Sequence, residues 1–286
     1  MSEHIFELNG KVRAVVKDGR VTEIEGPIKL EYCPLQNSLR GVDRITEDTI
    51  RNSIEGRIKA FGMCTEDRVI EIKPDFVDFG TSEIMACAME SGMIDAAVEP
   101  CDGAGTVIAS EPGVVQGIGG IMSGLVKTTP IPKLIDRLEN RGSIVIDSKS
   151  AKIDQKEGLK VAFEEGYKDV AVTVSKVDEA EVCRAIEKDG DGRVVLFGVH
   201  TSGMNEDDVK KFIELIDVTT SCASRYIREV ADRSLVQVGN GIPVFAFSET
   251  GKDIILNRIR YMKSQVMIKT CELPELPEVR QPRPLF

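Results

Sequence analysis

Three side chains suited to nucleophilic or acid–base chemistry come directly after predicted β-strands. Cys101, His200 and Cys222 each lie within two residues of the end of a strand, predicted at 94–99, 193–199 and 217–220. Ligands of open α/β sheets bind at the carboxyl ends of the strands. We therefore expect the two thiols and the imidazole to lie around one crevice, where a thiolate is a nucleophile and an imidazole is an acid or base. The alternative is that they are ordinary polar loop residues.

Further polar and glycine residues follow the same strands and could hold a small anionic cofactor. Glycine lets backbone N–H groups approach an anion, and a lysine adds positive charge. The residues in question are Asp102, Gly103, Gly105, Thr106, Gly117, Gly119, Gly120, Lys149, Lys176 and Asn240. The glycines fall in two stretches, residues 102–106 and 116–120, and neither has the spacing of a Walker A or dinucleotide-binding motif. Tight turns and close helix packing are the alternative explanation.

The seven cysteines also leave metal binding open. Cys33, Cys64, Cys101 and Cys222 lie at the ends of predicted elements, where thiolates could be exposed and could ligate an iron–sulfur cluster or another metal. No C-x-x-C pair supports this, so a redox or nucleophilic thiol pair is an equal alternative. Cys222 is the best candidate thiolate because a helix is expected to start directly after it. Cys87 and Cys183 fall inside predicted helices and are expected to be buried.

Composition excludes several classes of protein. The chain has 286 residues, with 37 basic and 47 acidic side chains, 42% hydrophobic residues and no tryptophan. The net charge of −10 and the few aromatic residues argue against nucleic-acid binding. The N-terminus lacks the basic and apolar parts of a signal peptide. The charge-poor stretch Val107–Val126 contains Glu111, Pro112 and five glycines, so we interpret it as a loop and a small-residue helix, not a membrane span. We expect a cytoplasmic protein.

The elements that position these residues fall into three parts. Residues 1–80 are predicted to form a β-meander with hairpin turns at Asn9-Gly10 and Asp18-Gly19, followed by a helix that begins at Thr46 and ends at Gly62. Residues 81–270 alternate helices and apolar strands, which predicts an α/β domain whose sheet is mostly parallel and flanked by helices. Residues 271–286 contain four prolines and are expected to run extended over the surface.

Several strings in the chain resemble the methanogenesis marker protein 8 family, from about residue 5 to 265. They are Tyr32–Leu35, Phe61–Thr65, Cys101–Val107, Val115–Gly120, Thr128–Pro132, Ile153–Gln155, Thr220–Ser224 and Val238–Pro243. The resemblance implies a cytosolic protein of methane-producing archaea with a link to methanogenesis, and it transfers no catalytic residue. A second, shorter likeness, over Thr81–Val98, is to beta subunits of coenzyme F420-reducing hydrogenases. That likeness implies only that a redox function remains among the alternatives for this protein.

Three functions are compatible with these observations. The first is an accessory protein of methanogenesis that binds a small anionic cofactor or a metal centre at the carboxyl ends of its sheet. By analogy with the distribution of the family, it would assist assembly or activation of methyl-coenzyme M reductase. The second is a thiol-dependent redox or transferase enzyme that uses Cys101 or Cys222 with His200. The third is a non-catalytic module that docks a protein partner of methanogenesis. No nucleic-acid or membrane partner is expected.

Overall fold

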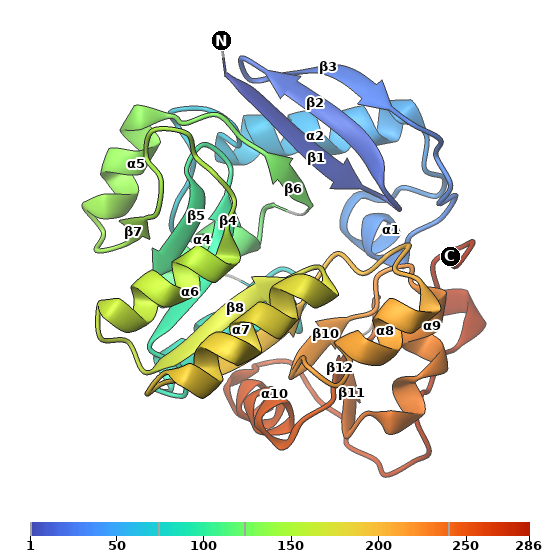
Figure 1. Ribbon diagram of the computed structural model, residues 1–286. Helices are drawn as coiled ribbons and strands as arrows, with labels where there is room; N and C mark the ends of the chain where they lie inside the picture. The colour runs from blue at the N-terminus through green and yellow to red at the C-terminus, as the bar shows by residue number, and fades with distance from the viewer. Residues whose placement is uncertain (1, 74, 123, 240) are drawn as a thin grey trace.

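The computed structural model of the protein contains two β-sheets (Figure 1). It describes residues 2–73, 75–122, 124–239 and 241–286. A four-stranded sheet and an eight-stranded sheet each build a hydrophobic core against helices. The larger sheet makes the chain an α/β protein.

The N-terminal meander has the predicted turns. It consists of β1 (Glu3–Leu8), β2 (Val12–Lys17) and β3 (Arg20–Glu25), paired antiparallel. Asn9 and Gly10 have φ angles of 41° and 83°, and Asp18 and Gly19 have 48° and 73°. Two consecutive positive φ angles are what a type I′ hairpin turn requires, and Asn-Gly and Asp-Gly adopt them most easily. The prediction of a meander is therefore confirmed.

The predicted helix after the meander is also confirmed, as α2 (Glu47–Phe61). The Thr46 hydroxyl accepts a hydrogen bond from the Thr49 N–H, and Gly62 ends the helix with a φ of 64°. Ile50 and Ile54 of this helix pack with the inward side chains of β1 and β2. The first turn of α1 (Pro34–Arg40) begins after Cys33.

One strand from the predicted α/β region, beyond residue 80, joins this N-terminal sheet. β6 (Leu125–Lys127) pairs antiparallel with β1, which gives the strand order β3-β2-β1-β6. A strand from beyond the predicted domain boundary at residue 80 therefore completes the N-terminal sheet. Whether the two parts fold independently stays a prediction.

The eight-stranded sheet is mixed, and the prediction of a mostly parallel sheet is wrong in this respect. Its order is β11-β12-β10-β9-β8-β4-β5-β7, and only the pairs within β10-β9-β8-β4 are parallel. The strands are β4 (Ala96–Cys101), β5 (Gly105–Ala109), β7 (Ile144–Val145), β8 (Asp169–Val174), β9 (Arg193–Gly198), β10 (Val218–Thr220), β11 (Val236–Val238) and β12 (Val244–Ala246). The β4–β5 and β11–β12 pairs are antiparallel because their connections are too short for a crossover.

The segment 100–130 contains two strands, β5 and β6, where the sequence predicted a loop and a helix. β5 follows β4 through a tight turn, and the helix α4 (Pro112–Gly119) comes next, before β6. Gly103 and Gly105 have φ angles of 85° and 75° in that turn. The glycines of this segment therefore form the turn of a β-hairpin between β4 and β5, where we had expected a loop.

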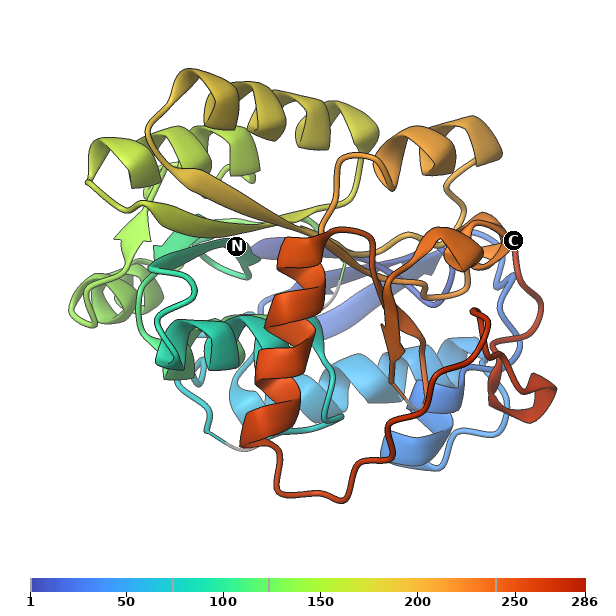
Figure 2. The same ribbon diagram turned by 90° about the horizontal axis from the view of Figure 1, so that it is seen from below.

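Helices cover both faces of the larger sheet (Figure 2). α3 (Thr81–Glu90), α4 and α10 (Glu249–Tyr261) lie on one face, and α6 (Gln155–Glu164) and α7 (Val177–Asp189) lie on the other. The remaining helices are α5 (Pro132–Glu139), α8 (Glu206–Phe212) and α9 (Arg225–Glu229). Along β9, Val194 and Leu196 pack toward one layer and Val195 and Phe197 toward the other. Coverage of both faces explains the continuous apolar run.

The C-terminal tail returns to the N-terminal region. Arg283 pairs with Tyr32 through backbone hydrogen bonds, and its guanidinium lies 4.5 Å from the centre of the Tyr32 ring. Phe286 packs against Gly10 of the first hairpin. Within the described ranges, no helix combines the length and the apolar character that a membrane crossing needs.

Candidate functional site

A cavity of about 430 Å³ lies between the N-terminal region and the larger sheet. The parallel strands reach it at their carboxyl ends, through Glu99 of β4, Thr173 of β8, His200 after β9 and Thr220 and Cys222 at the end of β10. This is the place where the topology of an open α/β sheet puts ligands. Its volume falls within the range of small-molecule sites.

The wall opposite the strand ends is mostly apolar. It is built from α1, α2, α3 and the loops between them, and its apolar side chains include Leu30, Leu35, Leu39, Phe61, Phe76, Phe79 and Met85. Phe61 and Phe76 meet edge to face, with ring centres 6.1 Å apart. An apolar wall facing a few polar groups is typical of sites for organic molecules.

Two arginines line the cavity without a carboxylate partner among the described residues. Arg57 of α2 is buried and donates through Nε and Nη1 to the Ser53 and Ile121 carbonyl oxygens, at 3.2 and 2.9 Å. Burial, together with the nearby charge of Arg40, lowers the pKa of Arg57 to about 10. Arg40, at the end of α1, is exposed, and among the described residues its guanidinium donates to the Gln36 amide oxygen alone, at 3.2 Å. The cavity therefore carries positive charge that no described side chain neutralises.

Glu99 is a buried carboxyl group on the cavity wall. It is only 2% exposed, and its Oε1 atom has no hydrogen-bond partner in the described part of the chain. Burial raises the pKa of Glu99 well above its ordinary value, against a smaller opposing effect of the Arg68 charge. The sequence analysis did not select Glu99. The available signal was a single charged residue within the apolar strand Ala96–Cys101.

His200 lies at the cavity as expected and pairs with a carboxylate from the other sheet. Its Nε2 atom is 3.2 Å from Oε2 of Glu7 in β1. This hydrogen bond, helped by Lys11, lowers the pKa of Glu7 to about 2, so Glu7 is ionised at neutral pH. His200 has a φ of 57°, an uncommon backbone conformation for a residue other than glycine. The pair can orient the imidazole toward a ligand.

Cys222 and Cys33 also line the cavity. Cys222 is half-buried, has a φ of 41°, and its sulfur lies 3.5 Å from the Thr220 hydroxyl. The expected helix does not begin directly after it, because Ser224 caps α9 and accepts the Ile227 N–H. Cys33 is buried, and burial raises the pKa of its thiol despite hydrogen bonds from two backbone N–H groups.

Cys101 does not reach the cavity, and the expectation that it carries an exposed thiolate is wrong. β4 continues through Cys101, which pairs with Gly105 inside the sheet, so the thiol lies in the core. Burial raises its pKa. Cys64 is likewise buried with a pKa far above the ordinary value. Both thiols stay protonated near neutral pH.

The glycine turn at 101–106 is closed by bonds within the protein. Asp102 forms a fully buried ion pair with Arg68, at 3.0 Å, and accepts the Cys64 N–H. The Gly103 N–H donates to the Thr128 hydroxyl and the Thr106 N–H to the Lys152 carbonyl oxygen. A side chain at Gly105 would lie 2.4 Å from the Ala151 backbone. These atoms do not form the open anion cradle that we expected.

The other predicted cofactor-binding residues divide between the cavity and the surface. Gly119 and Gly120, at the end of α4, line the cavity, whereas Gly117 packs against the backbone of Ile70. Lys149 and Lys176 are exposed and do not line it. Asn240 lies outside the described residues, although its neighbours Gly239 and Gly241 line the cavity.

The predicted four-cysteine metal site is not assembled. Cys33 and Cys222 line the cavity, while Cys64 and Cys101 lie in the core. No group of three or more Cys, His, Asp or Glu side chains within residues 2–73, 75–122, 124–239 and 241–286 is placed to hold a metal ion. The donor groups therefore do not fit an iron–sulfur cluster bound by these four thiols.

The cysteine environments predict an order of alkylation. Iodoacetamide should label the exposed Cys271 and the half-buried Cys222 in the folded protein, because a thiolate reacts only where solvent reaches it. The five buried thiols should react only after unfolding; among them Cys183 has a pKa raised to about 12 by burial. Peptide mass spectrometry after timed labelling measures the order. Labelling of Cys101 as fast as Cys222 would contradict the structure.

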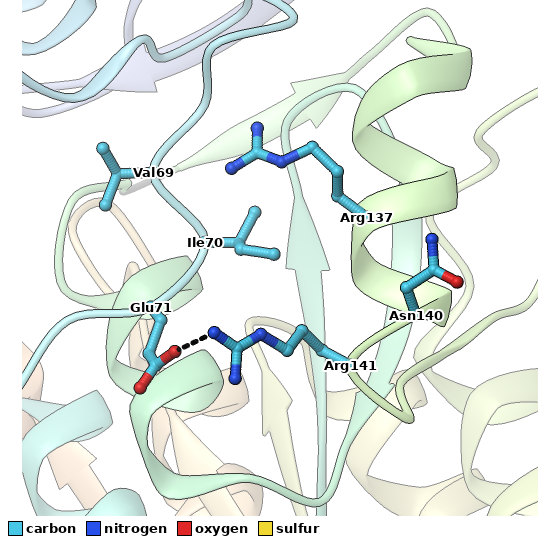
Figure 3. Close-up of a pocket in the computed structure, with 6 residues that line it drawn as sticks. All are labelled: Val69, Ile70, Glu71, Arg137, Asn140 and Arg141. Carbon is cyan, nitrogen blue, oxygen red and sulfur yellow. Dashed lines mark ion pairs between the residues drawn. The ribbon is translucent and has the colours of Figure 1, made fainter.

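A second hollow, of about 440 Å³, lies at the surface between α5 and the segment before α3 (Figure 3). Glu71 forms an ion pair with Arg141 at 2.8 Å there, and Arg137 donates to the Glu66 carbonyl oxygen at 2.9 Å. Arg137, Asn140 and Arg141 are all exposed. Because its charges already have partners and its side chains are solvated, this hollow is the weaker candidate.

Fold and cavity together define an α/β protein with a mixed sheet and a ligand-sized cavity at the ends of its parallel strands. The chain belongs to a family described as uncharacterized proteins conserved in archaea (DUF2099), which matches residues 4–260. It is 41% identical over 288 aligned residues to "Uncharacterized protein MJ0054" of Methanocaldococcus jannaschii, and the alignment covers all of both chains.

Proposed function

We propose that the protein binds a small organic anion in the cavity at the carboxyl ends of its parallel strands. The observation that carries this proposal is the pair Arg40 and Arg57, which lines an apolar cavity and has no carboxylate partner among the described residues. The negative groups nearby are already used. Glu7 pairs with His200, and the Glu83 carboxylate accepts backbone N–H groups of residues 76, 77 and 80.

The Arg57 guanidinium is a buried positive charge. A buried charge is costly unless it is paired and hydrogen-bonded. The hydrogen bonds that Arg57 makes within the described part of the chain use Nε and Nη1, which leaves Nη2 for a ligand. A carboxylate or phosphate can accept charge-assisted hydrogen bonds from a guanidinium, and these are the strong kind. An anion with an apolar body would satisfy both the arginines and the opposite wall.

For the cellular role, we propose an accessory protein of methanogenesis whose cavity takes an anionic cofactor. The support is the resemblance to methanogenesis marker protein 8, together with an archaeal family and an archaeal relative. Action on assembly or activation of methyl-coenzyme M reductase is an extension of this proposal by analogy. The cytoplasm, with a protein partner of methanogenesis, is the setting that the proposal implies.

A thiol-dependent enzyme is a second candidate. The observation that favours it is that Cys222 and His200 both line the cavity. Cys101 takes no part in it, because that thiol is buried in the core. In this reading Cys222 is the nucleophile or redox thiol, and His200, oriented by Glu7, is the acid or base.

Binding of a fluorescent anion tests the proposed function. The probe 8-anilinonaphthalene-1-sulfonate combines an aromatic body with one negative charge, and its emission rises in an apolar site. Arg40→Met should weaken its binding roughly tenfold, the effect of one charge-assisted hydrogen bond. Arg40 is exposed at the rim of the cavity, so the substitution should leave the fold intact.

Two controls make this titration decisive. Arg44→Met removes an exposed arginine that does not line the cavity, and should leave probe affinity unchanged. N-phenyl-1-naphthylamine, which has the same aromatic groups without the sulfonate, should bind wild type and Arg40→Met alike. If Arg40→Met binds the anionic probe as tightly as the wild type and Arg44→Met do, Arg40 does not belong to an anion site and the proposal fails.

A further inference from the structure

Glu99 is the one carboxyl group of the cavity that has an atom without a partner among the described residues. It belongs to β4, and with Ala97 and Cys101 it lies on the face of the strand that α4 covers. It is 2% exposed, yet it lines the cavity. A buried polar atom without a partner costs about 1–3 kcal/mol. A protein that retains such a group at a cavity has left an interaction open there.

We propose that the Glu99 carboxyl donates a hydrogen bond to an uncharged oxygen of the bound anion, so that the cavity recognises oxo or hydroxy acids. This inference rests on the proposed function, because it concerns a second polar contact to the same ligand. The arginines would hold the anionic group, and Glu99 would hold a carbonyl or hydroxyl oxygen. No ion pair joins Glu99 to either arginine within the described residues, so the two contacts are separate subsites.

The packing around Glu99 holds the carboxyl group in place. A side chain at Gly119 would lie 2.8 Å from Glu99 Oε2, so the glycine leaves the space that the carboxyl fills. Ser82 of α3 lies against the same glycine. Thr173 of β8 is already engaged, because its hydroxyl accepts from the Gln155 amide at 3.1 Å. Of the described residues named here, neither Ser82 nor Thr173 brings a charge to Glu99.

The charged groups near Glu99 do not ionise it. Arg68 is the basic group that acts on it, but Arg68 is paired with Asp102 at 3.0 Å and donates to the Gly117 carbonyl oxygen at 3.0 Å. Cys101, the remaining titratable neighbour on β4, is a buried thiol with a raised pKa. Burial therefore dominates and raises the pKa of Glu99, so the carboxyl keeps the proton that it needs to donate.

Two matched ligands separate the subsites. Cyclohexanecarboxylate and 4-oxocyclohexanecarboxylate carry the same anion and ring and differ only in one ketone oxygen. By isothermal titration calorimetry, the wild type should bind the keto acid about 3- to 10-fold more tightly, the value of one net hydrogen bond. Glu99→Leu should abolish that preference, and Glu99→Gln, whose amide can still donate, should keep part of it. Glu90→Leu, at the exposed end of α3, is the matched control and should keep it fully.

The pH dependence gives a second readout. As pH rises through the raised pKa of Glu99, the donor is lost and a negative charge faces the ligand oxygen. The preference for the keto acid should therefore fall with rising pH in the wild type. In Glu99→Gln it should stay constant over the same range, because the amide does not titrate.

The outcomes distinguish this inference from the proposed function. Equal affinity of the wild type for the two carboxylates would overturn the role of Glu99 and leave the anion site standing. Binding of neither carboxylate would overturn both. Infrared spectroscopy tests Glu99 without any ligand: a protonated carboxyl C=O band should be present at neutral pH and missing in Glu99→Gln. Absence of that band from the wild type would also overturn the inference.

Discussion

Arg68→Met should destabilise the protein by about 3–5 kcal/mol, the usual cost of leaving a buried charge without its partner. Arg68 and Asp102 are both fully buried, and their ion pair measures 3.0 Å. Arg68 also donates to the carbonyl oxygens of Gly117 and Ile118, at 3.0 and 3.3 Å. Its removal therefore leaves the Asp102 carboxylate unpaired and releases the end of α4. Urea unfolding followed by circular dichroism measures the loss of unfolding free energy.

Two further variants show whether the buried charge is the cause. Arg68→Met combined with Asp102→Asn should recover part of the lost stability, because no charge is left behind and the amide oxygen can still accept the Cys64 N–H. Arg193→Met breaks an ion pair of 2.6 Å whose side chains are 46% and 35% exposed, and should cost less than about 1 kcal/mol. Equal losses in Arg68→Met and Arg193→Met would contradict this account.

This ion pair also matters for the cavity. Arg68 fixes the carbonyl groups of Gly117 and Ile118, and the chain continues from there into Gly119 and Ile121. Gly119 packs against Glu99, and the Ile121 carbonyl oxygen accepts a hydrogen bond from the Arg57 guanidinium. The buried ion pair thus holds in place the segment 117–121, which contacts both Glu99 and Arg57. Asp102, which we had predicted to bind a cofactor, acts on the site through this support.

The sequence predicted those parts of the fold that depend on local chemistry. Asn9-Gly10, Asp18-Gly19 and the cap of α2 at Thr46 were correct because a few adjacent residues determine a hairpin turn or a helix start. The mixed order of the larger sheet was not predictable in this way. Whether a strand pairs parallel or antiparallel depends on partners distant in the chain, and β6, which lies in the predicted α/β region, pairs with β1 of the N-terminal sheet.

The candidate site was predicted only in outline. The rule about strand ends correctly brought His200 and Cys222 to the cavity. It failed for Cys101 because β4 runs two residues further than expected and carries that thiol into the sheet. Arg57 and Glu99 were missed because their chemistry comes from burial. Burial of a charged side chain follows from tertiary packing, which a pattern of residue types does not show.

Gly117→Ala should also reduce stability strongly, by roughly 1–3 kcal/mol or more, the usual cost of overpacking. A Cβ at Gly117 would lie 2.2 Å from the Ile70 carbonyl oxygen and 2.5 Å from its carbon. Backbone atoms on both sides cannot move aside as a flexible side chain can. The alternative from sequence was that Gly117 opens an anion cradle. In that case alanine would affect ligand binding and leave the unfolding free energy nearly unchanged.

A matched control for this substitution lies four residues earlier in the same helix. The three atoms nearest to a Cβ at Gly113 all belong to the Glu71 side chain, the closest at 2.7 Å, and a side chain can move where a backbone cannot. Gly113→Ala should therefore cost clearly less than Gly117→Ala, because only the Glu71 side chain and its solvent-exposed ion pair with Arg141 have to shift. Thermal and urea unfolding of the two variants give the comparison. If Gly117→Ala is as stable as Gly113→Ala, α4 does not approach Ile70 as closely as the structure shows, and the wall beside Glu99 is placed differently.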